Sequence, residues 1–127
     1  MARKPSKTLT EAELRLMDVL WQRGQATVAE VTAALPPPPI AYNSVLTTMR
    51  ILEQKGYVAH EEAGRAFIYR PLVEREAAAQ NAVGHLISRF FDNSAGALAL
   101  RLIETERPSK DELTRLKALI EEYEEGQ

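Results

Sequence analysis

Apolar residues recur every three or four positions through the first third of the chain, which predicts short helices. The first begins at Thr10, where Glu13 three residues later matches a capping box, and it ends before Gly24. A second capping box begins another helix at Thr27, and the prolines at 36–39 stop it because proline cannot continue the hydrogen-bond ladder. The apolar positions that these two helices should direct to a core are Leu14, Met17, Leu20, Trp21, Val28, Val31 and Leu35.

A third helix is predicted from Tyr42 to the residue before Gly56. Its apolar stripe is Val45, Met49 and Leu52. Small hydroxyl and amide side chains crowd its first half, although such residues are mediocre helix formers. We infer that this helix packs one face on its own domain and offers the other to a polar partner. That other face carries Asn43, Thr47, Arg50 and Gln54, with Leu46 between the two faces.

After Gly56 the period of the pattern changes from 3.6 to 2. One strand is predicted around Tyr57–His60, a turn at residues 62–64, and a return strand from Arg65 to Arg70. Three helices followed by a β-hairpin is the order of a winged helix-turn-helix domain. In that arrangement the third helix reads DNA and the hairpin is the wing.

Beyond Pro71 and the charged residues that follow, the pattern is helical to the end. One helix is predicted at about 74–91, a second capped by Asn93 or Ser94, and a third capped by Ser109. About fifty residues in three helices make a marginal core, so a second copy of the chain is the expected cover. The residues expected at that dimer interface are Val83, Ile87, Phe90, Phe91, Leu98, Leu102, Leu116 and Ile120.

The expected fold is therefore mainly α-helical with a small β-hairpin wing. We expect a loose basic tail at residues 1–9, a winged-helix DNA-binding domain at 10–72 and a helical dimerisation domain at 73–127. Residues 1–72 carry nine Lys and Arg against seven Asp and Glu, whereas the remainder carries seven against eleven. The more basic half is thus the one expected to meet a polyanion, although so small an excess permits DNA binding without proving it.

Several side chains of the third helix and the wing suit double-stranded DNA, because a major groove admits one helix and presents donors and acceptors on base edges. Asn43 could bridge adenine N6 and N7, and Arg50 could reach guanine or a phosphate. The wing's Arg65 would approach the minor groove or a phosphate. The sequence does not separate contacts that read bases from those that position the chain. The full set expected at DNA is Tyr42, Asn43, Ser44, Leu46, Thr47, Arg50, Lys55 and Arg65.

Two alternatives to DNA reading are compatible with the same sequence pattern. Many solvent-facing helices carry Asn, Thr, Arg and Gln and touch only water. Winged helices also serve as protein-interaction modules that never touch DNA, and this second alternative is the rival function from another class.

Composition indicates a globular protein and argues against disulfide-rich, membrane-spanning and secreted classes. Apolar residues make up 45% and charged residues 27%, which is typical of a globular chain. The absence of cysteine excludes disulfides and thiolate metal sites. No apolar run approaches the ~20 residues of a membrane span, and no apolar stretch follows the basic N-terminus as in a secretory signal. We expect a cytoplasmic protein without membrane insertion.

No catalytic, cofactor or metal motif is recognisable. His60 and His85 fall in different predicted domains without paired spacing, so we interpret His60 as a wing residue near DNA and His85 as a helix-surface or interface residue. The acidic run at 120–126 is typical of a solvated helix face. We expect no enzyme and no cofactor.

The run "AYNSVLTTMRILEQKGYVAHEEAGRAFIYRPLVEREA" resembles the penicillinase-repressor (BlaI/MecI/CopY) family. The shared features are Val-Leu-Thr at 45–47, Lys-Gly at 55–56, Gly-Arg at 64–65 and Tyr-x-Pro at 69–71. The segments "LTEAELRLMDVLW", "FFDNSAGALALRLIE" and "SKDELTRLKALIEEY" resemble the family's first helix and its dimerisation helices. The resemblance implies a homodimeric repressor of a palindromic operator, in a family that includes regulators of antibiotic resistance.

Two features depart from that family. Its copper-responsive branch senses metal through cysteines near the C-terminus, a mechanism that this cysteine-free chain excludes. Its β-lactam-responsive branch is inactivated by proteolysis at an Asn-Phe bond, and the corresponding position here is Arg101-Leu102. Arg101-Leu102 is thus the candidate proteolysis site, whose cleavage with the same specificity stays open, as does a cut at a neighbouring bond. A membrane-bound sensor protease is the partner that the resemblance implies for such a cut.

Overall fold

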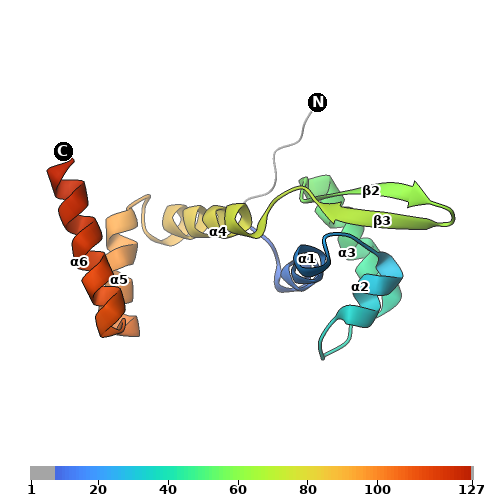
Figure 1. Cartoon of the computed structure of the whole chain (residues 1–127), viewed down its shortest axis with the longest axis horizontal. Coiled ribbons are helices and arrows are strands. Elements are labelled where there is room, and N and C mark those ends of the chain that lie inside the picture. Colours follow the sequence, from blue (N-terminus) through green and yellow to red (C-terminus); the bar gives the residue numbers. More distant parts are fainter. Residues whose placement is uncertain (1–7, 127) are drawn as a thin grey trace. The chain divides into compact units, whose positions relative to one another are not determined.

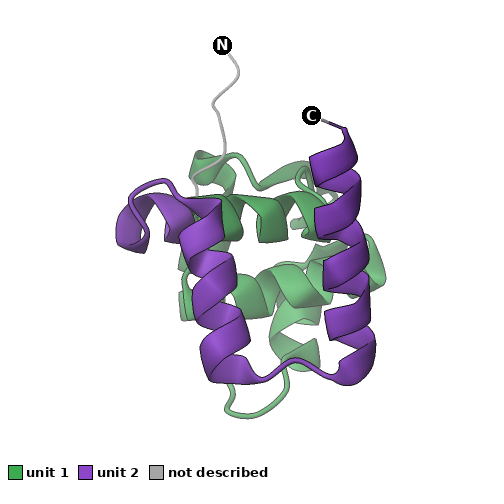
Figure 2. Ribbon diagram, turned by 90° about the vertical axis from the view of Figure 1, so that its left-hand side faces the viewer, with its two compact units in different colours: residues 1–85 green, residues 86–127 purple. Residues whose placement is uncertain are grey.

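The computed structural model describes residues 8–126 of the chain. The chain divides into two compact units, Met1–His85 and Leu86–Gln127 (Figure 2). The boundary expected at residue 72 lies within the first of these units, which also takes up the start of the next helix. Of the tail expected at 1–9, only Thr8 and Leu9 are among the described residues, and both are half-buried.

The first two helices of unit 1 begin where the capping boxes predict. The helix α1 (Glu11–Arg23) is capped by Thr10 and α2 (Val28–Ala34) by Thr27, and each box has both of its reciprocal hydrogen bonds. Gly24 ends α1 with a φ of +86°, a backbone angle that glycine adopts without the Cβ clash of other residues. Leu35 then leaves α2 in an extended conformation ahead of the prolines.

The helix α3 (Tyr42–Lys55) ends at Gly56, as predicted, and Gly56 has a left-handed conformation there. The stripe Val45, Met49 and Leu52 is fully buried, as predicted, and the face with Asn43 and Thr47 is exposed. The helix therefore packs against the rest of unit 1 through its apolar side and leaves its polar side exposed.

A three-stranded antiparallel sheet completes unit 1. Its hairpin consists of β2 (Val58–Ala63) and β3 (Ala66–Pro71) (Figure 1), and the short β1 (Ala26–Thr27) pairs with the other edge of β3. Ala63 pairs with Ala66, so the turn is Gly64-Arg65 and not the predicted 62–64. The return strand accordingly begins at Ala66, one residue later than expected.

The core of unit 1 lies where α1, α2 and α3 meet the sheet. The prediction that Leu14 belongs to it is wrong, because that side chain is 37% exposed while Leu16 and Val19 of the same helix are buried. Trp21 is half-buried, and its Nε1–H donates to the carbonyl of Val73, 2.9 Å away. The buried apolar residues are Leu16, Met17, Val19, Leu20, Ala26, Val28, Val31, Leu35, Val45, Met49, Leu52, Tyr57, Val58, Tyr69, Val73 and Ala78.

Three helices follow the hairpin, as predicted. The helix α4 (Arg75–Phe90) begins in unit 1 and continues into unit 2, where α5 (Ala95–Glu106) is capped by Ser94 and α6 (Lys110–Glu125) by Ser109. Neither α5 nor α6 has a single buried residue. Unit 2 thus forms helices in the predicted places without enclosing a core of its own.

Candidate nucleic-acid interface

A hollow of about 310 Å³ lies between α3, the start of α2 and the wing. Tyr42, Leu46 and Arg50 reach it from α3, and Arg65 reaches it from the tip of the hairpin. Four of the eight residues predicted to touch DNA are therefore brought together by the fold. The rest of the lining is Thr27, Val28, Ala29, Ala66 and Phe67.

Arg50 and Arg65 differ from the other arginines of unit 1. Both are exposed, and neither has a hydrogen bond or ion pair with any residue in the range 8–126. The other described arginines of this unit have polar partners, which are carboxylates or, for one of them, backbone carbonyls. Those partnered side chains are Arg15, Arg23, Arg70 and Arg75. The two arginines whose charge is left uncompensated are thus the two that line the hollow.

The exposed face of α3 also limits what its hydroxyl groups can do. Thr47 donates its Oγ1–H to the carbonyl of Asn43 (3.0 Å), and Thr48 donates to the carbonyl of Ser44 (2.8 Å). Thr47 therefore retains only acceptor capacity for a base edge, plus its methyl group. Asn43 and Ser44 remain exposed at the start of the helix, next to Tyr42.

The N-terminus of α3 differs from those of α1 and α2, because its N-cap residue, Ala41, makes no side-chain hydrogen bond. Backbone N–H groups in the first turn of such a helix are available to an anion, which the helix dipole also favours. Arg15 holds the preceding loop by donating to the carbonyls of Pro36 and Pro38. The loop that leads into α3 is therefore anchored to α1.

His60 joins α3 to the wing, a contact that the sequence did not predict. Its Nδ1–H donates to the carboxylate of Glu53 over 2.8 Å, and its ring stacks on Phe67 with the centroids 4.4 Å apart. Tyr69, the cross-strand neighbour of His60, is buried beneath them. Burial, reinforced by the nearby charge of Glu53, raises the pKa of Tyr69, so its phenol stays neutral. His60 therefore packs against the base of the wing and leaves the tip to Arg65.

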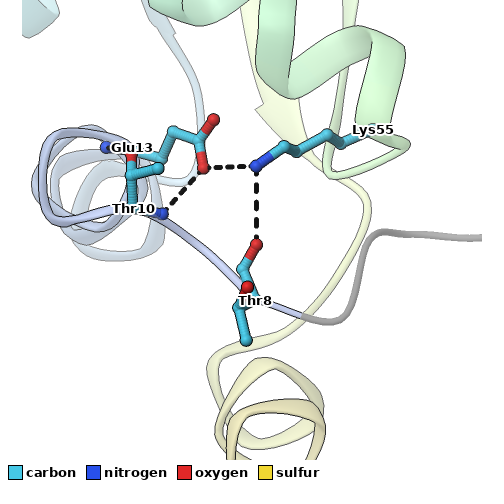
Figure 3. Close-up of polar contacts among 4 residues, drawn as sticks. All are labelled: Thr8, Thr10, Glu13 and Lys55. Atoms are coloured by element: carbon cyan, nitrogen blue, oxygen red, sulfur yellow. Dashed lines mark hydrogen bonds and ion pairs between the residues drawn. The ribbon is translucent and has the colours of Figure 1, made fainter. Parts of the chain in front are cut away.

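The structure does not bring Lys55 to the hollow. Its Nζ lies 2.7 Å from Oε1 of Glu13 and 3.5 Å from the carbonyl of Thr8, at the far end of α3 (Figure 3). The same oxygen of Glu13 accepts the N–H of Thr10 at 2.8 Å, so the capping box of α1 and the end of α3 share one carboxylate. The ammonium that was expected at a phosphate is already paired.

Among residues 8–126, no group of three or more His, Cys, Asp or Glu side chains is placed to hold a metal ion. None of the helices in this range is long and apolar enough to cross a membrane.

Residues 9–122 match the family model described as "Penicillinase repressor". This chain belongs to the penicillinase repressor family. The members of the family are transcriptional repressors, not enzymes. The prediction of the family from the sequence is thereby confirmed, and so is the prediction that the chain is not an enzyme.

Curated relatives cover nearly the whole chain. The penicillinase repressor of Bacillus licheniformis is 25% identical over 116 residues, which are 91% of each chain. The methicillin resistance regulatory protein MecI of Staphylococcus aureus is 20% identical over 113 residues, 88% of this chain and 92% of its own. The family match therefore extends through both units.

Solved structures share the fold. The DNA-binding domain of the repressor BlaI is 27% identical, with a TM-score of 0.52 over 58% of this chain and 92% of its own. The oxidized form of MarR from E. coli covers 91% of this chain and 75% of its own, with a TM-score of 0.50 at 15% identity, and so compares in fold alone. The winged-helix fold predicted from the sequence is thereby confirmed.

Proposed function

We propose that this repressor binds double-stranded operator DNA with α3 in the major groove and Arg65 of the wing on the phosphate backbone. The observation that carries the proposal is the pair Arg50 and Arg65, whose charges have no partner within the described residues and which meet at one hollow beside the exposed face of α3. Phosphates and guanine edges are the ligands that such unpaired guanidinium groups prefer. The name of the BlaI domain, a DNA-binding domain with 27% identity, supports the same conclusion.

Replacing Arg50 by Ala should weaken specific binding by about 1–3 kcal/mol, the range for a lost bidentate base contact. Stability should hardly change, because the side chain is exposed and makes no ion pair with described residues. The measurement is titration of a DNA fragment that the full chain has selected from a random pool. Arg70→Ala is the matched control, because Arg70 is an exposed arginine nearer the base of the wing whose charge already faces Glu61. Unchanged affinity in both Arg50→Ala and Thr47→Ala would show that the wrong face of α3 has been assigned.

Arg65→Ala should behave differently, because the tip of a wing positions the chain on the backbone. Affinity should fall to a similar degree on selected and on unrelated DNA. The slope of log K against log salt concentration should become shallower by roughly one unit, since one phosphate contact is lost. Relaxed preference at a single base pair, with the slope unchanged, would instead mean that Arg65 reads sequence.

The proposed repressor is a homodimer on a palindromic operator. Unit 2 supports this, since large apolar side chains lie exposed along its helices and no residue of α5 or α6 is buried. Among the predicted interface residues, Phe90 is 75% exposed and Ile120 54% exposed. A two-fold related copy would cover such a surface, and the two reading helices would then meet half-sites about one helical turn, roughly 34–36 Å, or a multiple of it apart.

Release from DNA by proteolysis within unit 2 is the proposed route of derepression. Arg101 and Leu102 lie in α5 and are exposed, with the guanidinium of Arg101 5.9 Å from the centre of the Phe91 ring. A cut at this bond or a neighbouring one would divide the helices that hold the dimer together. A membrane-bound sensor protease is the partner proposed for this step. The name of the MecI relative makes resistance genes the candidates for regulation.

A winged-helix module that binds a protein instead of DNA is the competing function. No contact among residues 8–85 favours it, and one experiment separates the two functions. Mobility shifts with the promoter DNA of the chain's own gene are measured at two salt concentrations. Specific binding whose log K falls linearly with log salt concentration would support a repressor that contacts DNA. The absence of any shift at low salt would support the protein-binding module.

A further inference from the structure

A second hollow, of about 320 Å³, lies between α1 and the first half of α4, within unit 1 and outside the face proposed for DNA. It lies at the stretch of α1 where the sequence predicted a buried stripe and the structure leaves Leu14 37% exposed. The lining residues are Thr8, Leu9, Leu14, Trp21, Arg75, Ala78, Ala79 and Ala82.

Side-chain size explains why this space is open. Beyond Arg75, the part of α4 that lines it consists of three alanines, whereas α1 contributes the large Leu14 and Trp21. Methyl groups on one wall cannot fill the gap that larger apolar side chains would close, so apolar surface stays uncovered. An apolar cavity of about 150 Å³ accommodates a benzene molecule. The present hollow, at 320 Å³, has room for a larger aromatic body.

At one end of the hollow, hydrogen bonds hold the side chains of Trp21 and Arg75 in place. The indole of Trp21 is held by its hydrogen bond to Val73. The guanidinium of Arg75 lies 4.8 Å from the centre of the Trp21 ring, and its Nη2 is 2.7 Å from Oδ1 of Asp18. That is the one hydrogen bond Arg75 makes to a described residue, and a guanidinium has five N–H donors. Donors therefore remain for an anion placed beside the aromatic wall.

We propose that this hollow is a binding site for a small aromatic monocarboxylate. The ring would lie between Trp21, Leu14 and the alanines, and the carboxylate would pair with the free N–H groups of Arg75. A hollow lined by eight residues matches a small molecule, because an interface between copies needs about 800 Å² from each partner. The bound molecule would contact α4, the helix that continues from unit 1 into unit 2. A ligand in contact with that helix could act as an effector of this repressor.

The test is titration of the full chain, without DNA, by 2-naphthoate and by neutral 2-naphthamide. Trp21 is the only tryptophan, so the NMR signal of its indole N–H reports on this site alone. We expect a saturable shift with 2-naphthoate. Ala82→Leu, which fills the hollow, should lower its affinity at least tenfold, and Ala77→Leu, an exposed alanine of α4 outside the lining, should not. Arg75→Gln should lower the affinity for 2-naphthoate at least tenfold and leave 2-naphthamide unchanged.

Four results would overturn the proposal. The first is the absence of a saturable shift in the unsubstituted chain. The second is equal affinity for the carboxylate and the amide, and the third is equal affinity of Ala82→Leu and Ala77→Leu for 2-naphthoate. The fourth is a changed sedimentation coefficient for Ala82→Leu with its helix content intact by circular dichroism, which would make the hollow a contact between copies. Because no DNA is present, none of these outcomes depends on the operator-binding proposal.

Discussion

A chain that ends at His85 should fold, yet bind its operator at least about 100-fold more weakly than the full chain. Linking two binding modules raises overall affinity by factors of 10² to 10⁴, because the second contact becomes intramolecular. All the buried apolar residues among the described residues precede His85, so the core of the DNA-binding unit survives this cut. What is lost is the apolar surface of unit 2, and with it the second reading helix.

Sedimentation and operator titration of both chains measure this effect. A monomeric full chain, or a fragment that binds as tightly as the whole, would contradict the dimer model. A chain cut after residue 72 is a useful comparison, since it lacks Val73, the hydrogen-bond acceptor of Trp21, and the buried Ala78. It should unfold more easily than the 1–85 fragment by about 1–3 kcal/mol, from lost burial and an unpaired indole N–H.

The helices were predictable because their signals are local. Thr10, Thr27 and Ser109 each stand three residues before a glutamate, and all three boxes form. Gly56 ended its helix as predicted because a left-handed backbone there favours glycine. The strand β1 was missed because two residues have no periodicity, and only their pairing with β3 makes them a strand.

The tertiary contacts were harder to predict. The helical spacing of Leu14 with Met17 predicts a core position, but spacing does not say what lies opposite, and the alanines of α4 are too small to cover Leu14. Local pattern predicts a DNA-facing element for each of Arg50 and Arg65. That they share one hollow, and that other arginines of the unit are paired, depends on folding that brings distant residues together.

Lys55 is the residue whose observed contact differs most clearly from the predicted one. Local pattern put it at the end of a reading helix and suggested a phosphate contact, whereas in the structure it lies 2.7 Å from Glu13. The side chain of Glu13 is only 5% exposed and that of Lys55 is 24% exposed. Removing one member of a buried ion pair costs more than the pair contributes, because the other charge is left without compensation.

Lys55→Met should therefore lower the free energy of unfolding by about 2–4 kcal/mol, somewhat below the usual range for a fully buried pair because water still reaches the lysine. Methionine preserves much of the apolar stem, so the loss is mainly one of charge. Denaturant unfolding measures the change. Glu13→Gln in the same chain removes the uncompensated charge while keeping a residue that suits the capping box, so the double variant should recover part of the loss. A double variant no more stable than Lys55→Met would show that charge is not the cause.

The same variant decides between the two roles of Lys55. If its ammonium serves only Glu13, then operator affinity measured well below the unfolding transition should keep its dependence on salt. If it also touches a phosphate, the slope of log K against log salt should become shallower by roughly one unit, as expected for Arg65→Ala. We expect an unchanged slope, because an ammonium 2.7 Å from a buried carboxylate would have to break that pair to reach DNA. A shallower slope together with unchanged stability would reverse the assignment and return Lys55 to the DNA interface.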